Sequence, residues 1–449
     1  MRMIAIFVAI LSLFPVAAFA QDDLRAAPTI KVTVQSLPAP VAPTTLQPRF
    51  DAARATEAYL AKVHGQARAR SDAYFEGGYV LIFVDAVYAI IVAAIILWLG
   101  LSKRMRDVAE HLTQVRSFQI PLYVASYIAL TTAMSLPLAV YEEFFREHAF
   151  GLSNQNFGQW LGDFGTASAV NLVVSAIVLT VIYAVIRRAP KTWWLWGTLV
   201  AVLFLGIGIF LGPVFVAPLF NHYMPLKEGP FKSEILSIVR AEGIPATDVY
   251  EFDASRQTKR ISANVSGLFG TTRISMNDSL LKRCDHDEII AVLGHEMGHY
   301  VLNHAALLLT WYGLLFLAGF AFVNWGYGRI VNLYGADWGV RGLDDVAGLP
   351  VLAALMSFFF LVATPVSNTI TRSAEAQADI FGINAVRKPD GFARATLMLS
   401  EYRKLDPSPL EEFVFYDHPS GRSRILMAMR WKLEHRNDWD VKNGPVSPQ

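Results

Sequence analysis

The sequence predicts a mainly α-helical protein that crosses a membrane several times and carries a small β-sheet outside the bilayer. Of its 449 residues, 53% are hydrophobic and only 17% are charged. This composition is too apolar for an ordinary soluble domain. Six stretches after residue 78 are each long and apolar enough to span a bilayer as a helix. Two hydrophilic segments, residues 221–304 and 371–449, flank the last two stretches. We therefore expect six transmembrane helices, or seven if the N-terminal apolar segment also stays in the membrane.

The first twenty residues have the pattern of a secretory signal peptide. Arg2 precedes an apolar core, and Ala18-Phe19-Ala20 fits a signal-peptidase site. The alternative is an uncleaved anchor helix, which would be the seventh span. Residues 21–78 are predicted to be a polar, partly proline-rich linker followed by a helix that includes residues 52–68.

The predicted spans divide the rest of the chain into four parts. Residues 79–220 are expected to form a four-span membrane domain, and residues 305–370 two further helices. Residues 221–304 and 371–449 then form one hydrophilic domain from two segments. Asp85, in the first span, is either a functional intramembrane acid or a hydrated acid near the helix end. The six spans are expected at residues 79–101, 120–140, 166–186, 192–220, 305–323 and 349–370.

Basic residues gather in the first and third predicted loops. The loops hold, respectively, Lys103, Arg104, Arg106 and Arg116, and Arg187, Arg188 and Lys191. The second loop has only Arg146, among several acids. Because loops rich in Lys and Arg stay in the cytoplasm, the hydrophilic domain should face outward. We expect a multi-pass protein of a bacterial inner membrane with a periplasmic hydrophilic domain; a cytoplasmic domain is the alternative.

Charge and cysteine content exclude some partners and sites. The net charge of +1 indicates no nucleic-acid partner. The single cysteine, Cys284, excludes an internal disulfide and a zinc site built from cysteines. The lipid bilayer is the expected partner, and the sequence leaves the oligomeric state open.

The pentapeptide His295-Glu296-Met297-Gly298-His299 matches H-E-x-x-H, a zinc-binding helix pattern. Residues four apart lie on one face of a helix, so both histidines can bind one ion. Zinc lowers the pKa of a bound water to roughly 7, and the adjacent glutamate can take its proton during attack on a carbonyl. Asp285 and Glu288 form a capping-box pattern for a largely buried helix over residues 285–302. The pattern predicts one zinc ion per chain and a polypeptide substrate.

A catalytic zinc site usually has three protein ligands. Ala305 stands where the metzincin pattern requires a third histidine. His304 is one residue away and is expected to cap the helix or hydrogen-bond locally. Glu375 and Asp379, four apart after the last span, offer a third ligand and a carboxylate that orients a ligand histidine. Alternatively, both acids solvate the start of a helix.

Residues 261–268 and 272–276 have the pattern of two strands joined by a turn at Phe269-Gly270. The first strand, with Ala263, Asn264 and Val265, could bind an extended peptide through backbone hydrogen bonds at a sheet edge. The Asn264 side chain would add a further hydrogen bond. Otherwise this is an edge strand whose polar residues prevent aggregation.

Several separated motifs resemble those of the integral-membrane gluzincin metallopeptidases, typified by the type I CAAX prenyl protease. The resemblance extends from about the first span to Met429. In chain order the motifs are Glu147-His-Ala-Phe-Gly-Leu-Ser-Asn-Gln with Trp160-Leu-Gly-Asp163, Pro218-Leu-Phe-Asn-His-Tyr-Met-Pro-Leu-Lys-Glu-Gly229, Ser262-Ala-Asn-Val-Ser-Gly267, the metal helix with Asn303-His304, residues 372–379, and His418-Pro419 with Arg424.

The resemblance implies roles for the matching positions. His295, His299 and Glu375 would bind zinc, Glu296 would be the general base, and Asp379 would support the ligands. His418 and Arg424 would stabilise the oxyanion of the intermediate, for which fixed positive donors matter most.

This chain departs from the family in topology. The family typically has seven spans around a large intramembrane chamber and a cytosolic active site, whereas six spans and an outward site are predicted here. We therefore expect a zinc metalloendopeptidase, with a gluzincin zinc-protease domain, that cleaves membrane-associated or misfolded polypeptides. The alternatives are a cytosol-facing CAAX-type C-terminal processing endopeptidase, and a membrane chaperone that keeps zinc without hydrolysis.

Overall fold

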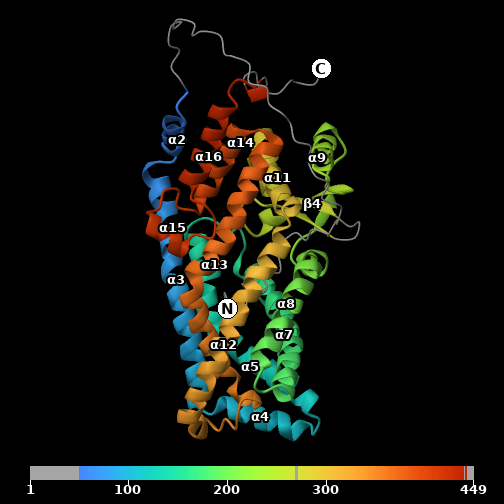
Figure 1. The fold of residues 1–449 in the computed structure, drawn as a ribbon, viewed down its shortest axis with the longest axis vertical. Helices are drawn as coiled ribbons and strands as arrows, with labels where there is room; N and C mark the ends of the chain where they lie inside the picture. The colour runs from blue at the N-terminus through green and yellow to red at the C-terminus, as the bar shows by residue number, and fades with distance from the viewer. Residues whose placement is uncertain (1–49, 268–271, 439, 442–449) are drawn as a thin grey trace, which may run out of the picture.

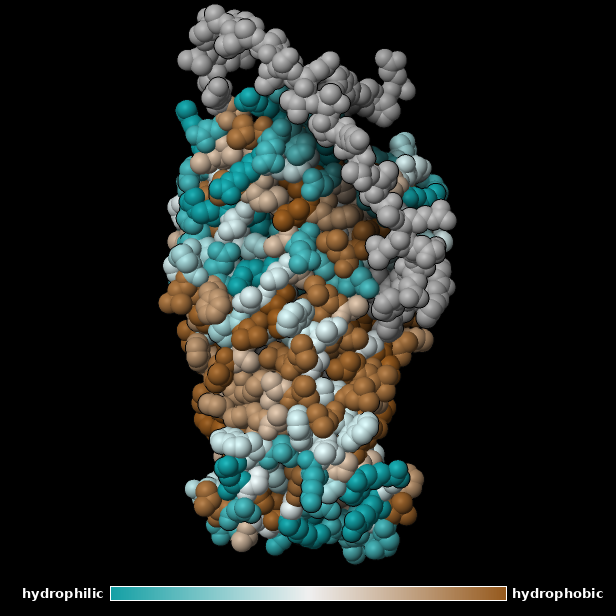
Figure 2. All heavy atoms as spheres, viewed as in Figure 1, coloured by the Kyte–Doolittle hydropathy of each residue, from teal (hydrophilic) through white to brown (hydrophobic). Residues whose placement is uncertain are grey.

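Long, roughly parallel helices form the body of the molecule. The computed structural model describes residues 50–267, 272–438 and 440–441. At one end lies the short helix α4 (Leu101–Leu112), and at the other lie α9 (Pro230–Ala241), α11 (His286–Val301), α14 (Pro389–Met398), α16 (Gly421–Glu434) and the sheet (Figure 1). On the face shown in Figure 2, apolar residues cover the middle of the helices between two more hydrophilic ends. The long helices are α3 (Gly65–Trp98), α5 (Arg116–Ala139), α7 (Phe157–Arg188), α8 (Trp193–Leu211), α12 (His304–Trp338) and α13 (Leu349–Val386).

Five helical segments in the described chain are long and apolar enough to cross a membrane, namely Gly65–Trp98, Arg116–Ala149, Phe157–Arg188, His304–Trp338 and Val346–Val386. The fourth expected span, residues 192–220, is instead a pair, Trp193–Ile209 and Gly212–Leu219, bent by 49°. Pro213 cannot donate a backbone hydrogen bond, which explains a break there. The pair makes a sixth span if it is counted as one. The predicted signal peptide or anchor, residues 1–20, lies outside the described residues.

Two helix boundaries differ from the prediction. The expected helix over residues 52–68 is two helices, α2 (Ala52–Leu60) and the beginning of α3, because Gly65 adopts a left-handed backbone with φ of 59°. The first span therefore begins at Gly65, before residue 79. At the other end of the chain, α13 continues past the last span without a break. Glu375 and Asp379 thus lie on the same helix as that span.

A four-stranded mixed sheet lies beside α11. The strand order is β1 (Tyr223–Pro225), β2 (Asp248–Phe252), β4 (Arg273–Asn277) and β3 (Ala263–Ser266). β2 and β4 are parallel, and the other pairs are antiparallel. The predicted strand pair is confirmed, and β3 is an edge strand, shorter than expected.

Apolar side chains join this sheet to α11. Val265, Ile274, Leu293 and Met297 are completely buried in one cluster. Burying each such side chain contributes about 1.5–3 kcal/mol. The predicted capping box is confirmed, because Asp285 accepts from the Glu288 N–H and Glu288 accepts from the Asp285 N–H. The helix that carries the H-E-x-x-H pattern therefore has a fixed beginning and a fixed inner face.

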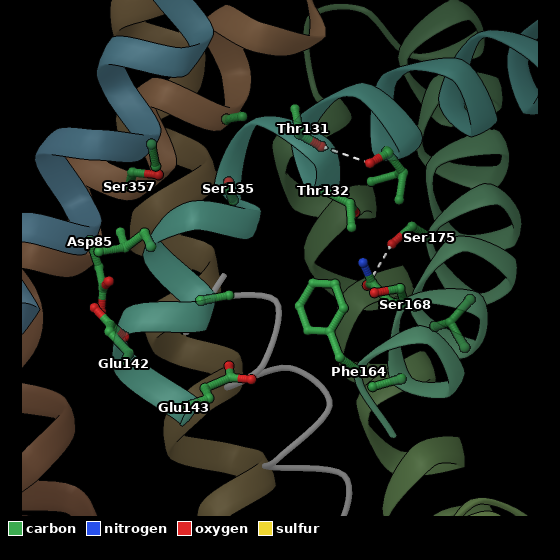
Figure 3. Close-up of a pocket in the computed structure, with 18 of the residues that line it drawn as sticks. Asp85, Thr131, Thr132, Ser135, Glu142, Glu143, Phe164, Ser168, Ser175 and Ser357 are labelled. Carbon is green, nitrogen blue, oxygen red and sulfur yellow. Dashed lines mark hydrogen bonds between the residues drawn. The ribbon is translucent and has the colours of Figure 1, made fainter. Parts of the chain in front are cut away.

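A cavity of about 910 Å³ lies among the spans, and we call it the membrane cavity. It is lined from α3, α5, α7, α8, α12 and α13. Figure 3 shows Asp85, Glu142 and Glu143 toward one side, with Ser168 and Ser175 toward the other. Asp85 thus lines a cavity whose wall is mainly apolar, with polar side chains at a few places. Whether it is a functional acid or a hydrated one stays a prediction.

Candidate active site

The active-site region is built where α11 and α13 cross in backbone contact. A Cβ at Gly298 would lie 2.8 Å from the Cα of Ala378. A Cβ at Gly382 would lie 2.6 Å from the backbone nitrogen of His295. Only glycine permits such approaches, because real Cβ atoms do not tolerate contacts this short with backbone. The close crossing brings the acids of α13 to the histidines of α11.

Three of the predicted ligands meet at this crossing. His295 Nε2 lies 3.1 Å from His299 Nε2 and 3.1 Å from Glu375 Oε2. His299 Nε2 lies 3.5 Å from Glu375 Oε1. One ligand atom from each residue lies within 4.8 Å of the others, so a single ion could touch all three. The structure therefore brings His295, His299 and Glu375 together as the sequence predicted.

The outer nitrogens of both histidines are also engaged. His295 Nδ1 is 2.7 Å from Asp379 Oδ1, the carboxylate predicted to orient it. His299 Nδ1 is 3.0 Å from His304 Nδ1, and His304 Nε2 is 3.3 Å from Gln377 Oε1. His304 thus bonds locally, as expected, while Asn303 occupies the N-cap position of α12. These contacts direct both Nε2 atoms toward Glu375, which is how second partners orient metal ligands.

The donor set fits a zinc ion. Two imidazole nitrogens and one carboxylate match the composition of catalytic zinc sites. Burial disfavours the charged imidazole, yet Asp379 and Glu375 outweigh it and raise the pKa of His295 to about 10. A field that favours a proton there also favours a metal cation. Glu375 Oε2 is buried without a regular hydrogen bond in the described part of the chain, which suits a ligand atom.

Glu296 follows the first ligand on α11. Among the described residues its carboxylate forms no hydrogen bond or salt bridge, so it can accept a proton. Burial raises the pKa of Glu296 above the usual carboxyl range, against the opposing effect of His295 and His299. A raised pKa makes this carboxylate a stronger base toward a nearby water.

Arg424 and His418 occupy different places around the ligands. Arg424 is buried and donates from Nε at 2.8 Å and from Nη2 at 2.6 Å to the two oxygens of Asp379. His418 Nε2 lies 3.2 Å from Glu375 Oε2, and its Nδ1 lies 2.8 Å from Asp417 Oδ1. His418 thus faces the ligand cluster, while Arg424 acts on it through Asp379. An oxyanion role for either residue stays a prediction.

Two neighbours of His418 escaped the sequence reasoning. Asp417 orients its Nδ1, and Arg403 Nη2 lies 3.4 Å from its Nε2. Asp417 directly precedes His418, so the sequence alone could have suggested it as the acid that orients this histidine. Arg403 gave no signal, because nothing local to it marks a tertiary contact.

The predicted substrate strand lies next to the metal helix. β3 packs on α11, and its Ala263 and Val265 side chains point into the core. Asn264 is partly exposed and accepts from Ser266 Oγ at 3.1 Å. In the described part of the chain, β3 pairs with β4 on one side only, and a role of its other edge in binding substrate stays a prediction.

Comparison with known proteins identifies the family. The profile of peptidase family M48 matches residues 225–432. The profile described as CAAX prenyl protease N-terminal, five membrane helices, matches residues 42–222. The uncharacterized metalloprotease YhfN of Bacillus subtilis is 32% identical over 73% of this chain and 78% of its own length. The chain belongs to peptidase family M48.

Other relatives agree with this assignment. CAAX prenyl protease 1 of Saccharomyces cerevisiae is 27% identical over 66% of this chain and 69% of its own length. The crystal structure of Saccharomyces mikatae Ste24p superposes with a TM-score of 0.63 at 21% identity, over 84% of this chain and 88% of that one. This M48 peptidase is therefore a membrane-embedded, multi-pass metalloendopeptidase with a Ste24p-like fold.

Proposed function

We propose that this M48 peptidase binds one zinc ion through His295, His299 and Glu375 and hydrolyses membrane-associated or misfolded polypeptides. The single observation that carries the proposal is the convergence of these ligands, with Asp379 behind one of them. A zinc ion bound there would supply Lewis-acid chemistry to a water and to the scissile carbonyl.

The protein's own residues account for the remaining steps. Glu296 takes the proton of the attacking water and passes it to the leaving amine, the usual role of a general acid–base. His418, fixed by Asp417, is positioned to donate from Nε2 to the oxygen on which negative charge develops. The backbone of β3 would hold the peptide extended beside α11.

The charge distribution supports a periplasmic site. α4 carries Lys103 and Arg104, the last turn of α7 carries Arg187 and Arg188, and the turn before α8 carries Lys191. α4 lies at the end opposite to α11 (Figure 1). A cytoplasmic location for the basic end leaves α11 outside. The names of the CAAX prenyl protease relatives favour the alternative substrate class, a CAAX-type C-terminal processing activity.

Casein hydrolysis by the purified, zinc-supplied protein tests the chemistry. We expect Glu296→Gln to lower the rate by about 100-fold or more, because general acid–base catalysis contributes about 10²–10⁴-fold. Zinc content should remain at one per chain. The matched control is Glu434→Gln, at an exposed position of α16, which should keep the wild-type rate. Unchanged hydrolysis by Glu296→Gln would remove the general-base assignment.

A further inference from the structure

A second cavity, of about 620 Å³, adjoins the membrane cavity and reaches Asp417, the residue before His418, and we call it the site-side cavity. Tyr74, Arg146, Thr258 and Arg260 line both cavities and so form the wall between them. Arg403 and Asp417, the neighbours of His418, line the site-side cavity but not the membrane cavity. The site-side cavity therefore begins next to the catalytic residues.

Cations outnumber acids among the charged residues that line the site-side cavity. Its charged residues are Arg146, Arg260, Arg403 and Asp417, three cations to one acid. The acid already bonds His418 Nδ1 at 2.8 Å. Arg260 donates to Glu147 at 2.9 Å, but its buried Nε has no hydrogen-bond partner in the described structure. A positive excess in a partly enclosed site attracts an anionic group.

Arg403 is the cation best placed to bind a ligand. Its side chain is partly buried, and within the described residues it forms no salt bridge. Its only side-chain hydrogen-bond contact there is His418 Nε2, at 3.4 Å. Its backbone carbonyl is fixed by Ser71 Oγ at 3.1 Å. A guanidinium with free N–H donors suits a carboxylate, which it can bind through two parallel hydrogen bonds.

The sheet indicates which part of a peptide would reach these arginines. The site-side cavity lies at the beginning of β3, because Ile261 and Ser262 line it. Asn277 fixes this point, accepting from the Ser262 N–H at 3.1 Å and donating to the Arg260 carbonyl at 2.7 Å. Antiparallel pairing is the commoner arrangement, and a peptide paired so with β3 runs with its C-terminal end toward Ser262.

We propose that Arg403, with Arg260, forms a subsite that recognises a carboxylate on the C-terminal side of the scissile bond. The carboxylate is either the free C-terminus of the substrate or an Asp or Glu side chain. This subsite rests on the proposed peptidase function and determines which peptides are cut.

A matched peptide set tests the subsite in the full-length, zinc-loaded protein. One casein cleavage site, mapped by mass spectrometry, supplies a core sequence for internally quenched peptides. In the first set, the peptide ends a few residues after the cleaved bond, in either a free carboxylic acid or an amide. In the second set, a longer peptide with an amidated C-terminus carries Asp, Asn or Lys at the position where the first set ends. We expect about 10- to 100-fold higher kcat/KM for the carboxylate-bearing peptides, the usual gain from a charged hydrogen bond.

Variants assign the preference to Arg403. Arg403→Gln should abolish the preference for carboxylate-bearing peptides by raising their KM while kcat is retained, as expected when a binding contact is lost. Arg403→Lys should restore part of it, and Arg403→Glu should favour the Lys peptide. Arg430→Gln, at an exposed position of α16, is the control and should change nothing. If the free-acid peptide is cleaved better than the amide, the subsite binds the C-terminal carboxylate. If the Asp peptide is cleaved better than the Asn peptide, the subsite binds a side-chain carboxylate.

Two outcomes would overturn the subsite. One is equal cleavage of all the peptides by the wild type; the other is an equal loss of kcat on all of them in Arg403→Gln, which would indicate an effect on His418 instead. If the wild type cleaves neither casein nor any peptide, the proposed function itself fails, and the two failures remain distinguishable.

Discussion

At the scale of single residues, the proposed metal ligands are held by a series of contacts between charged side chains. Arg424 binds both oxygens of Asp379, and Asp379 in turn holds His295. Both charges are buried, so neither can be removed without leaving the other unpaired. The contact orients His295 for metal binding and leaves fewer Arg424 donors for an oxyanion.

Replacing Arg424 distinguishes a role in orienting His295 through Asp379 from a role in stabilising the oxyanion. We expect Arg424→Gln to lower zinc affinity by about 10- to 100-fold, the usual effect of losing a partner of a metal ligand. It should also destabilise the fold by about 3–5 kcal/mol, because Asp379 is left buried and unpaired. Chelator competition and chemical denaturation measure these effects. Unchanged zinc affinity with a reduced kcat would favour the oxyanion role instead.

At the scale of elements, the crossing of α11 and α13 decides whether a site exists. Gly294, Gly298 and Gly382 remove the side chains that would separate the two helices. Without that contact, Glu375 could not come within 3.1 Å of His295 Nε2. The glycines of H-E-M-G-H and of α13 are thus as necessary as the ligands, although they touch no metal.

A pair of alanine substitutions tests this crossing. Gly382→Ala should destabilise the protein by about 1–3 kcal/mol through overpacking and lower its zinc content, because the new Cβ meets the backbone of His295. Gly328→Ala in α12 is the control, since its Cβ meets nothing within 4 Å. It should stabilise the helix by up to about 1 kcal/mol. Thermal unfolding and zinc analysis measure both effects. Equal unfolding temperatures and zinc contents for the two variants would contradict the proposed role of the glycine contact.

Motifs that depend on residues close together in the sequence could be predicted, whereas contacts between distant helices could not. The zinc helix, its capping box and the edge strand follow from spacings of a few residues. Glu375 and Asp379 were predicted together because they lie four residues apart directly after the last predicted span. The engagement of Arg424 by Asp379, the glycine contacts and the place of Arg403 depend on how distant helices pack. The bend after α8 was missed because hydropathy alone does not register a break at Pro213.

At the scale of the whole molecule, the two hydrophilic ends differ in the charges that remain free. Arg106 counted toward the predicted orientation, yet it is buried and paired with Asp345 at 2.6 Å. Lys103, Arg104, Arg187, Arg188 and Lys191 remain at that end and maintain the bias. Positive charge near span ends is retained in the cytoplasm, so the bias still favours an outward site.

Fusions of reporter proteins measure the orientation. We expect alkaline phosphatase fused after Gln449 to be active and a green fluorescent protein there to be dark, since the first works only outside and the second only in the cytoplasm. Fusions placed after Pro190, between α7 and α8, serve as the control and should give the opposite pattern. Fluorescence at Gln449 would support the cytosol-facing alternative.

The distance in sequence between the ligands also governs when activity can begin. His295 and Glu375 are separated by the whole of α12 and most of α13. A ribosome adding roughly 5–20 residues per second makes the third ligand seconds after the first two. Both spans must then enter the bilayer before α13 can cross α11. With the proposed ligands, a nascent or truncated chain carries an incomplete metal site. We therefore expect this protease to become active only when its own insertion is finished, so that its assembly intermediates cannot degrade their neighbours.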